Sequence, residues 1–110
     1  MTIENPDSVD GMGISKSDGK VVLTISDHVE WSDEKKHFNL IEKKINAYLD
    51  FIRGGQMLEA LPNSKGREIR IEIIYQHHPS DIGGRFLMAA KRQLWAEGVD
   101  LVYKALSDKY

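Results

Sequence analysis

The stretch KVVLTISDH at residues 20–28 decides the fold, because its alternation of apolar and polar residues is the clearest strand pattern in the chain. Val21, Leu23 and Ile25 point to one side, so that side faces a core. Just before it, Asp18-Gly19 supplies the positive φ that a tight hairpin requires, which predicts that residues 9–15 pair with this strand. The same alternation at residues 67–77 predicts another strand with one buried face.

Two stretches have the apolar spacing of amphipathic helices. The first begins after Ser32, a residue type that favours the N-cap, and ends at the glycine pair 54–55. The second opens at Pro79-Ser80-Asp81 and runs to about residue 97. Residues 56–61, which precede a turn-rich loop, and residues 99–103 are predicted as further strands.

The order of elements is therefore strand, strand, helix, strand, strand, helix, strand (ββαββαβ). It predicts an α+β two-layer sandwich, in which two helices cover one face of a five-stranded antiparallel or mixed sheet. Without the first strand the order is βαββαβ, so the fold is a ferredoxin-like variant. In that fold the strand at 20–28 already has two neighbours, and a hairpin partner must displace one of them. The strand order of the sheet therefore stays open.

Length and composition restrict the class of protein. The 110 residues form one domain, with a polar, loosely held arm at residues 1–8 and a frayed tail at 104–110. Without cysteine there is no disulfide, thiolate metal site or cysteine nucleophile. A net charge of −2, and sheet positions without aromatic side chains for base stacking, argue against nucleic acid. No apolar run could span a membrane and no secretion signal is present, so a cytoplasmic location is expected.

Polar residues that could carry chemistry gather at one predicted edge of the sheet. If the strands at 20–28 and 67–77 are parallel neighbours, all four histidines meet there. Imidazoles and carboxylates can bind a divalent metal or a small ligand, or transfer protons. No pair has the spacing of a known metal motif, so the metal stays unknown, and neither a catalytic residue nor a cofactor is assigned. The candidates for ligand binding in this rim are Asp27, His28, Glu30, Trp31, His37, His77, His78 and Arg85.

Each feature of this rim also has a purely structural interpretation. Polar residues collect at strand ends because loops are solvated. Trp31 is interpreted as a buried corner of the strand–helix joint, with stacking on a ligand as the alternative. Gly83 and Gly84 could expose backbone N–H groups to a phosphate, or could let the helix pack closely against the sheet.

Each helix carries a second apolar stripe outside its core face. Methionine, tryptophan and arginine together are typical of interface centres, which indicates a protein partner or a second copy of the chain. The alternative is that the two stripes cover each other or are covered by the C-terminal tail. The candidates for an interface are Leu40, Ala47 and Phe51 on the first helix and Met88, Arg92 and Trp95 on the second.

Residues 22–28, followed by Trp31-Ser32-Asp33-Glu34, resemble the signature of a small bacterial family known as a domain of unknown function. Lys65-Gly66-Arg67 and Arg85-Phe86-Leu87 extend the resemblance, which covers about residues 9–103. It implies no activity. The sequence therefore favours a non-enzymatic protein-association domain, homodimeric or accessory to a larger system. The alternative is a module that binds a small ligand or a divalent metal through the histidine and carboxylate rim.

Overall fold

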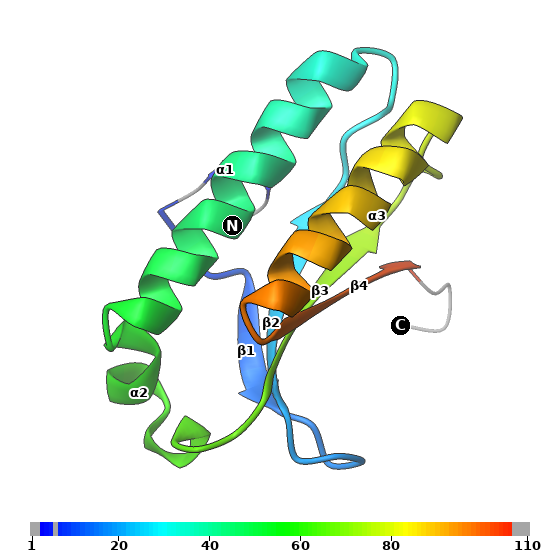
Figure 1. The fold of residues 1–110 in the computed structure, drawn as a ribbon. Helices are drawn as coiled ribbons and strands as arrows, with labels where there is room; N and C mark the ends of the chain where they lie inside the picture. The colour runs from blue at the N-terminus through cyan, green and yellow to red at the C-terminus, as the bar shows by residue number, and fades with distance from the viewer. Residues whose placement is uncertain (1–2, 6, 107–110) are drawn as a thin grey trace.

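The computed structural model describes residues 3–5 and 7–106. It contains a four-stranded mixed sheet in the order β1-β2-β3-β4, together with helices α1, α2 and α3 (Figure 1). Strand β1 pairs with β2 in antiparallel fashion, whereas β2, β3 and β4 run parallel to one another. In chain order the elements are β1 (Gly11–Ile14), β2 (Val21–Asp27), α1 (Glu34–Arg53), α2 (Gln56–Ala60), the short 3₁₀ helix η1 (Pro62–Ser64), β3 (Ile69–Tyr75), α3 (Asp81–Ala96) and β4 (Val99–Ala105).

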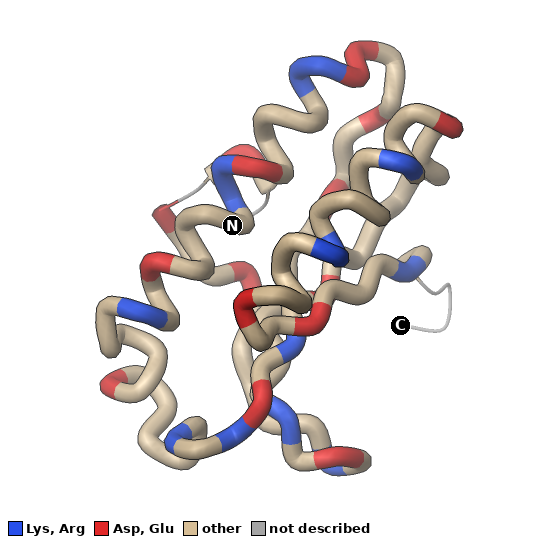
Figure 2. Tube along the Cα trace, in the orientation of Figure 1, with Lys and Arg blue, Asp and Glu red and all other residues tan. Residues whose placement is uncertain are grey.

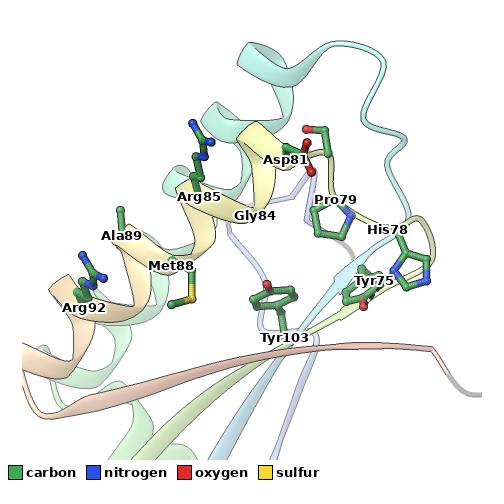
Figure 3. Close-up of a pocket in the computed structure, with 11 residues that line it drawn as sticks. Tyr75, His78, Pro79, Asp81, Gly84, Arg85, Met88, Ala89, Arg92 and Tyr103 are labelled. Atoms are coloured by element: carbon green, nitrogen blue, oxygen red, sulfur yellow. Dashed lines mark hydrogen bonds between the residues drawn. The ribbon is translucent and has the colours of Figure 1, made fainter.

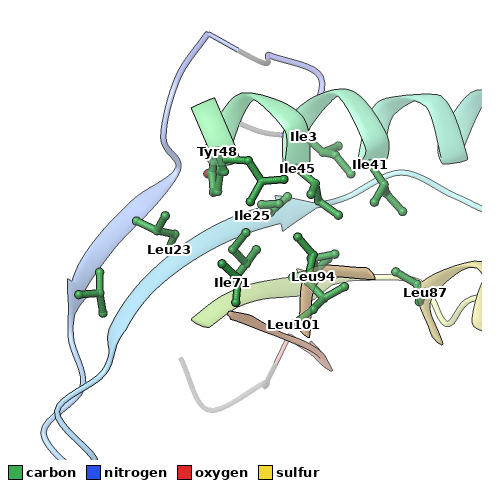
Figure 4. Packing of buried hydrophobic residues seen from close by; sticks show 14 of the residues in the cluster. Ile3, Leu23, Ile25, Ile41, Ile45, Tyr48, Ile71, Leu87, Leu94 and Leu101 are labelled. Carbon is green, nitrogen blue, oxygen red and sulfur yellow. The ribbon is translucent and has the colours of Figure 1, made fainter. Parts of the chain in front are cut away.

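The core lies between one face of this sheet and the helices α1 and α3, which cover that same face (Figure 1). Alternate residues of β2 are completely buried, as the sequence pattern predicted. Figure 4 shows Leu23, Ile25 and Ile71 pointing from the strands toward Ile45 of α1 and Leu94 of α3. Each such side chain contributes about 1.5–3 kcal/mol when it leaves water. The predicted two-layer arrangement, with helices on one face, is therefore confirmed.

The predicted fifth strand at residues 56–61 is wrong. Residues 56–60 form α2, which places buried Met57 against the core. The segment Gln-Met-Leu-Glu-Ala has no β-branched residue and consists of good helix formers, and Gly55, with φ of 83°, turns the chain between α1 and α2. The sheet therefore has four strands. Because its last three strands are parallel neighbours, the ferredoxin-like order is also wrong.

The helix starts show how local polar groups set the boundaries. Asp33, rather than the predicted Ser32, is the N-cap of α1, and its carboxylate accepts a hydrogen bond from the Lys36 N–H at 3.1 Å. The negative charge also suits the positive end of the helix dipole. The second helix starts within the predicted segment Pro79-Ser80-Asp81: Ser80 is the N-cap of α3, and its hydroxyl accepts from the Gly83 N–H at 3.0 Å.

The structure describes residues 3–5 and 7–8 of the N-terminal arm, and they lie against the domain instead of forming the loose arm predicted for residues 1–8. Ile3 is buried in the core and its N–H donates to the Ser26 carbonyl at 2.9 Å. Residues 1, 2 and 6 lie outside the described residues. At the other end, Lys104 and Ala105 continue β4 instead of fraying, and residues 107–110 of the predicted tail lie outside the described residues.

A completely buried lysine fastens this arm to α1. The ammonium group of Lys44 donates to the carbonyls of Asn5 at 2.5 Å and Ser8 at 2.6 Å, and to the Asp10 carboxylate at 2.9 Å. The other carboxylate oxygen of Asp10 accepts from the Ser26 N–H at 2.9 Å. All three ammonium protons therefore have acceptors, which is the condition under which a buried charge is tolerated.

Tyr48 joins the same cluster one helical turn farther along. Its hydroxyl donates to the Thr24 carbonyl at 2.5 Å and accepts from the Asp10 N–H at 2.9 Å. Burial raises the pKa of Tyr48 to about 12, because the phenolate would lose its hydration. The phenol therefore stays neutral and links β2, the arm and α1.

The uncovered face of the sheet carries a line of paired charges. Arg70 binds Asp18 at 2.8 Å and Glu72 at 2.9 Å, and Glu72 also binds Lys104 at 3.1 Å. The hydrogen bond from the Lys20 N–H and the Arg70 guanidinium lower the pKa of Asp18 to about 2. Figure 2 shows both signs of charge interspersed along the helices and strands. In the part of the chain that the structure describes, no helix covers this face, and these charged side chains pair with one another.

Within residues 3–5 and 7–106, no helix combines the length and the apolar character needed to cross a membrane.

Candidate functional site

Two of the predicted rim residues form a buried pair at the carboxyl end of β2. The His37 Nε2 atom lies 2.6 Å from Asp27 Oδ2, and both side chains are almost completely buried. The second ring nitrogen, Nδ1, lies 3.2 Å from the carbonyl oxygen of Glu30. Asp27 also accepts a hydrogen bond from the Val29 N–H at 3.1 Å. The pair therefore closes the loop between β2 and α1.

The contact between His37 and Glu30 indicates which ring nitrogen of His37 donates a hydrogen bond. A carbonyl oxygen can only accept, so Nδ1 carries a proton toward Glu30. Opposite Nε2 stands the Asp27 carboxyl group, at the 2.6 Å distance of a direct hydrogen bond. Such a pair could take part in proton transfer only if a substrate reached it. Because neither side chain is exposed, the geometry assigns the pair to the structure of the loop.

Trp31 packs against His37 and is partly buried at the joint between β2 and α1. Its indole stacks on the His37 ring with a centroid distance of 3.8 Å and an interplanar angle of 23°. It also contacts Phe38 edge-on at a centroid distance of 5.8 Å. From the other side, Gly83 of α3 approaches the indole so closely that a Cβ atom there would lie 2.6 Å from Trp31 Cζ3. Gly83 is therefore a packing glycine.

Replacing Gly83 with alanine is expected to lower the free energy of unfolding by about 1–3 kcal/mol, because the added methyl group overpacks the Trp31 ring. Gly84→Ala is the matched control, since a Cβ atom there meets nothing within 4 Å. It should raise stability by up to about 1 kcal/mol through helix propensity. Urea unfolding of both variants measures the difference. Equal stability of the two variants would contradict the close contact.

The remaining rim residues do not converge on one point. His28 is exposed and pairs with Glu4 at 2.8 Å, while His77 is exposed at the start of the loop before α3. His78 lies beside Tyr75, with Nδ1 3.5 Å from the phenol oxygen. The side chain of Glu30 is exposed, although its carbonyl binds His37. Among the described residues, no three histidine, aspartate or glutamate side chains are grouped so that they could hold a metal ion.

A shallow groove of about 670 Å³ lies between α3 and the carboxyl ends of β3 and β4 (Figure 3). Met88 of α3 and Tyr103 of β4 point toward each other across it, and Tyr75 lines the groove beside His78 (Figure 3). The two tyrosine rings are 5.9 Å apart, centroid to centroid. Of the rim predicted from sequence, His78 and Arg85 line this groove. Its floor is aromatic and its helix side is basic.

The two predicted interface stripes differ in how far their side chains are exposed. On α1, Leu40 and Phe51 pack partly against the core, and Ala47 and Phe51 border residues 7–9 of the N-terminal arm. All three α1 candidates are therefore partly buried within the chain. On α3, by contrast, Trp95 is 66% exposed and Met88 is 49% exposed. We refer to Arg85, Met88, Arg92 and Trp95 as the α3 stripe.

Sequence reasoning missed two groups of residues. The buried cluster of Lys44, Asp10 and Tyr48 was not predicted, although a lysine inside the apolar spacing of a helix is a usable signal. Tyr75 and Tyr103 were not predicted as groove residues. Tyr75 of β3 and Tyr103 of β4 are diagonal neighbours, two register positions apart, because Tyr103 is opposite Ile73 and Tyr75 is opposite Ala105. Only the pairing of β3 with β4 brings them together.

Comparison with known proteins gives one result. No curated protein and no solved structure matches this chain. The sequence model of a family described as "Family of unknown function (DUF6572)" matches residues 1–107. This confirms the resemblance to a domain of unknown function inferred from residues 22–34. Because the match covers nearly all of its 110 residues, the chain belongs to the family DUF6572.

Proposed function

We propose that this domain works by protein association, without catalysis, and that the α3 stripe is its binding surface. The observation that carries the proposal is the exposure of Trp95 at 66% on a regular helix, next to Met88 at 49%. An exposed tryptophan of this kind leaves a large apolar area in water, and a partner that covers it gains about 25 cal/mol per Å².

The composition of the stripe supports the same proposal. Tryptophan, methionine and arginine are the residue types enriched at the energetic centres of protein interfaces. Among the described residues, neither Arg85 nor Arg92 has a hydrogen-bond or ion-pair partner, so both guanidinium groups are available to a partner. Arg53, on α1, is instead paired with Glu97.

Site-specific photo-crosslinking in cells that naturally produce the chain tests this proposal. With a benzophenone amino acid at position 95, we expect a discrete adduct heavier than the 12.5 kDa chain. The same group at Lys16, an exposed residue of the β1–β2 turn, is the matched control and should give no discrete adduct. Adding Arg92→Glu should reduce the position-95 adduct at least several-fold. If position 95 gives no more adduct than position 16, the proposal is wrong.

A further inference from the structure

We infer that the partner presents an extended, acidic segment that pairs with the free edge of β4 beneath the α3 stripe. This inference rests on the proposed function and names the chemistry of the partner. Three features of the groove, as residues 3–5 and 7–106 form it, carry this inference: an open strand edge, an aromatic floor and two arginines without a partner.

Within the part of the chain that the structure describes, the edge of β4 is open only in its second half. Lys91 of α3 crosses the edge and donates to the Leu101 carbonyl at 2.7 Å and to Asp100 at 3.0 Å. The Leu101 carbonyl therefore points away from β3, and by the alternation of a strand so do the N–H and C=O groups of Tyr103 and Ala105. The Leu106 N–H donates to the Tyr75 carbonyl of β3 at 2.8 Å. Leu106 therefore points toward β3, and its neighbour Ala105 points away from it. Lys91 blocks one half of the edge, and the other half can accept a strand.

The side of the groove above this open edge suits a polypeptide better than a small metabolite. The groove is shallow, whereas a metabolite site encloses most of its ligand. The rings of Tyr75 and Tyr103 and the side chain of Met88 form an apolar floor next to the free backbone groups (Figure 3). An added strand would satisfy the free backbone groups and cover this floor at once.

The charges of α3 select an acidic segment. Arg85 and Arg92 are seven residues apart, which corresponds to about 10.5 Å along the helix. In an extended strand, alternate side chains point to the same side at intervals of about 7 Å. Two carboxylates at alternate positions of the segment are therefore within reach of the two arginine side chains. A segment with lysine in these positions would be repelled.

The same charges argue against a second copy that docks through its own stripe. Two stripes facing each other would bring four arginine side chains together, and like charges that face each other across an interface repel. Among the described residues that line the groove, Asp81 at the start of α3 is the one with a carboxylate. The geometry therefore points to a different, acidic chain as the partner.

A designed probe tests the inference: a blocked seven-residue peptide in which Glu alternates with Val. We expect amide shifts in NMR spectra of the whole 110-residue chain to be confined to residues 101–106 and α3. Binding should weaken at least threefold between 50 and 200 mM salt, since roughly two ion pairs form. The same peptide with Lys in place of Glu should not bind. Equal binding of the two peptides would overturn the inference.

Matched variants separate the contributions of charge and edge. Arg92→Glu should weaken peptide binding about tenfold or more, while Lys65→Glu, an exposed change at the opposite end of the sheet, should leave it within about twofold. Ala105→Pro removes one outward N–H without removing a hydrogen bond to β3, and should weaken binding about 3- to 10-fold. Binding that is insensitive to both Arg92→Glu and Ala105→Pro would contradict the inferred pose.

The crosslinking experiment at position 95 distinguishes the two proposals. If position 95 gives a site-dependent adduct with another protein but the Glu-Val peptide does not bind, protein association stands and the acidic strand is wrong. An adduct of twice the chain mass, together with a dimer in sedimentation equilibrium that Arg92→Glu dissociates, identifies a second copy and also overturns the acidic strand. Absence of both adduct and peptide binding overturns both proposals.

Discussion

Replacing Lys44 with methionine is expected to lower the free energy of unfolding by about 3–5 kcal/mol, which is the cost of leaving a buried charge without its partner. Methionine keeps the apolar stem but removes the ammonium group. The Asp10 carboxylate, whose side chain is 1% exposed, would then keep only the hydrogen bond from the Ser26 N–H. The carbonyls of Asn5 and Ser8 would lose their donor as well.

Urea unfolding followed by tryptophan fluorescence measures this loss. Lys43→Met is the matched control, because Lys43 is the exposed neighbour on the same helix, and it should change stability by no more than about 0.5 kcal/mol. The double variant Lys44→Met/Asp10→Asn should recover part of the loss, because no unpaired charge then remains buried. Hydrogen exchange should show the amides of Ile3 and Ser26 opening first in Lys44→Met. Equal stability of the Lys43 and Lys44 variants would show that the hydrogen bonds of Lys44 do not hold the N-terminal arm.

Replacing His37 with leucine is expected to have an effect of similar size, about 3–5 kcal/mol, because it leaves the buried Asp27 carboxylate without its charged or proton-sharing partner. The stacking of Trp31 on the imidazole is lost as well. The informative comparison is Asp27→Asn. An asparagine there can donate to His37 Nε2 while its oxygen still accepts from the Val29 N–H, so this variant should lose only about 1 kcal/mol.

Urea unfolding of the two single variants and of the double variant checks this second prediction. In the double variant His37→Leu/Asp27→Asn the loss should be smaller than the sum of the two single losses, since no isolated charge remains. The fluorescence of Trp31 should shift in every variant that lacks His37. A loss of more than about 3 kcal/mol for Asp27→Asn would mean that the charge of Asp27, rather than its hydrogen bonds, holds the loop.

Much of the fold follows from local patterns. The alternation in residues 20–28 and 67–77 places Leu23 and Ile71 on the buried face of the sheet, as observed. Asp18-Gly19 forms the predicted turn, with φ of 74° at Gly19. The error at residues 56–61 has a local cause too. A short apolar run between turn signals fits a strand or a helix, and the absence of β-branched residues is a weak guide. Because β2 and β3 are parallel, the chain between them must cross from one end of the sheet to the other, and helices α1 and α2 lie in this connection.

The candidate site was less accessible to prediction. The carboxyl ends of β2 and β3 lie side by side, but the sequence could not tell which polar residues are buried there. Asp27 and His37 pair because the loop between them folds back, whereas His77 stays exposed at a similar strand end. Trp95 was correctly placed on an outward stripe by helical periodicity. Its exposure, however, depends on whether another part of the chain covers α3, and periodicity cannot determine that.

By itself the sequence determined the two layers, the turn at Gly19 and the side of each element that faces the core. These properties depend on neighbouring residues, through the periods of 2 and 3.6 that strand and helix geometry impose. The tertiary structure alone decided the parallel order of β2, β3 and β4, the hydrogen bonds between Lys44 and the N-terminal arm, and the groove beside Tyr103. These features join residues far apart in the chain, and their free energy depends on burial and charge pairing that exist only after the layers have packed.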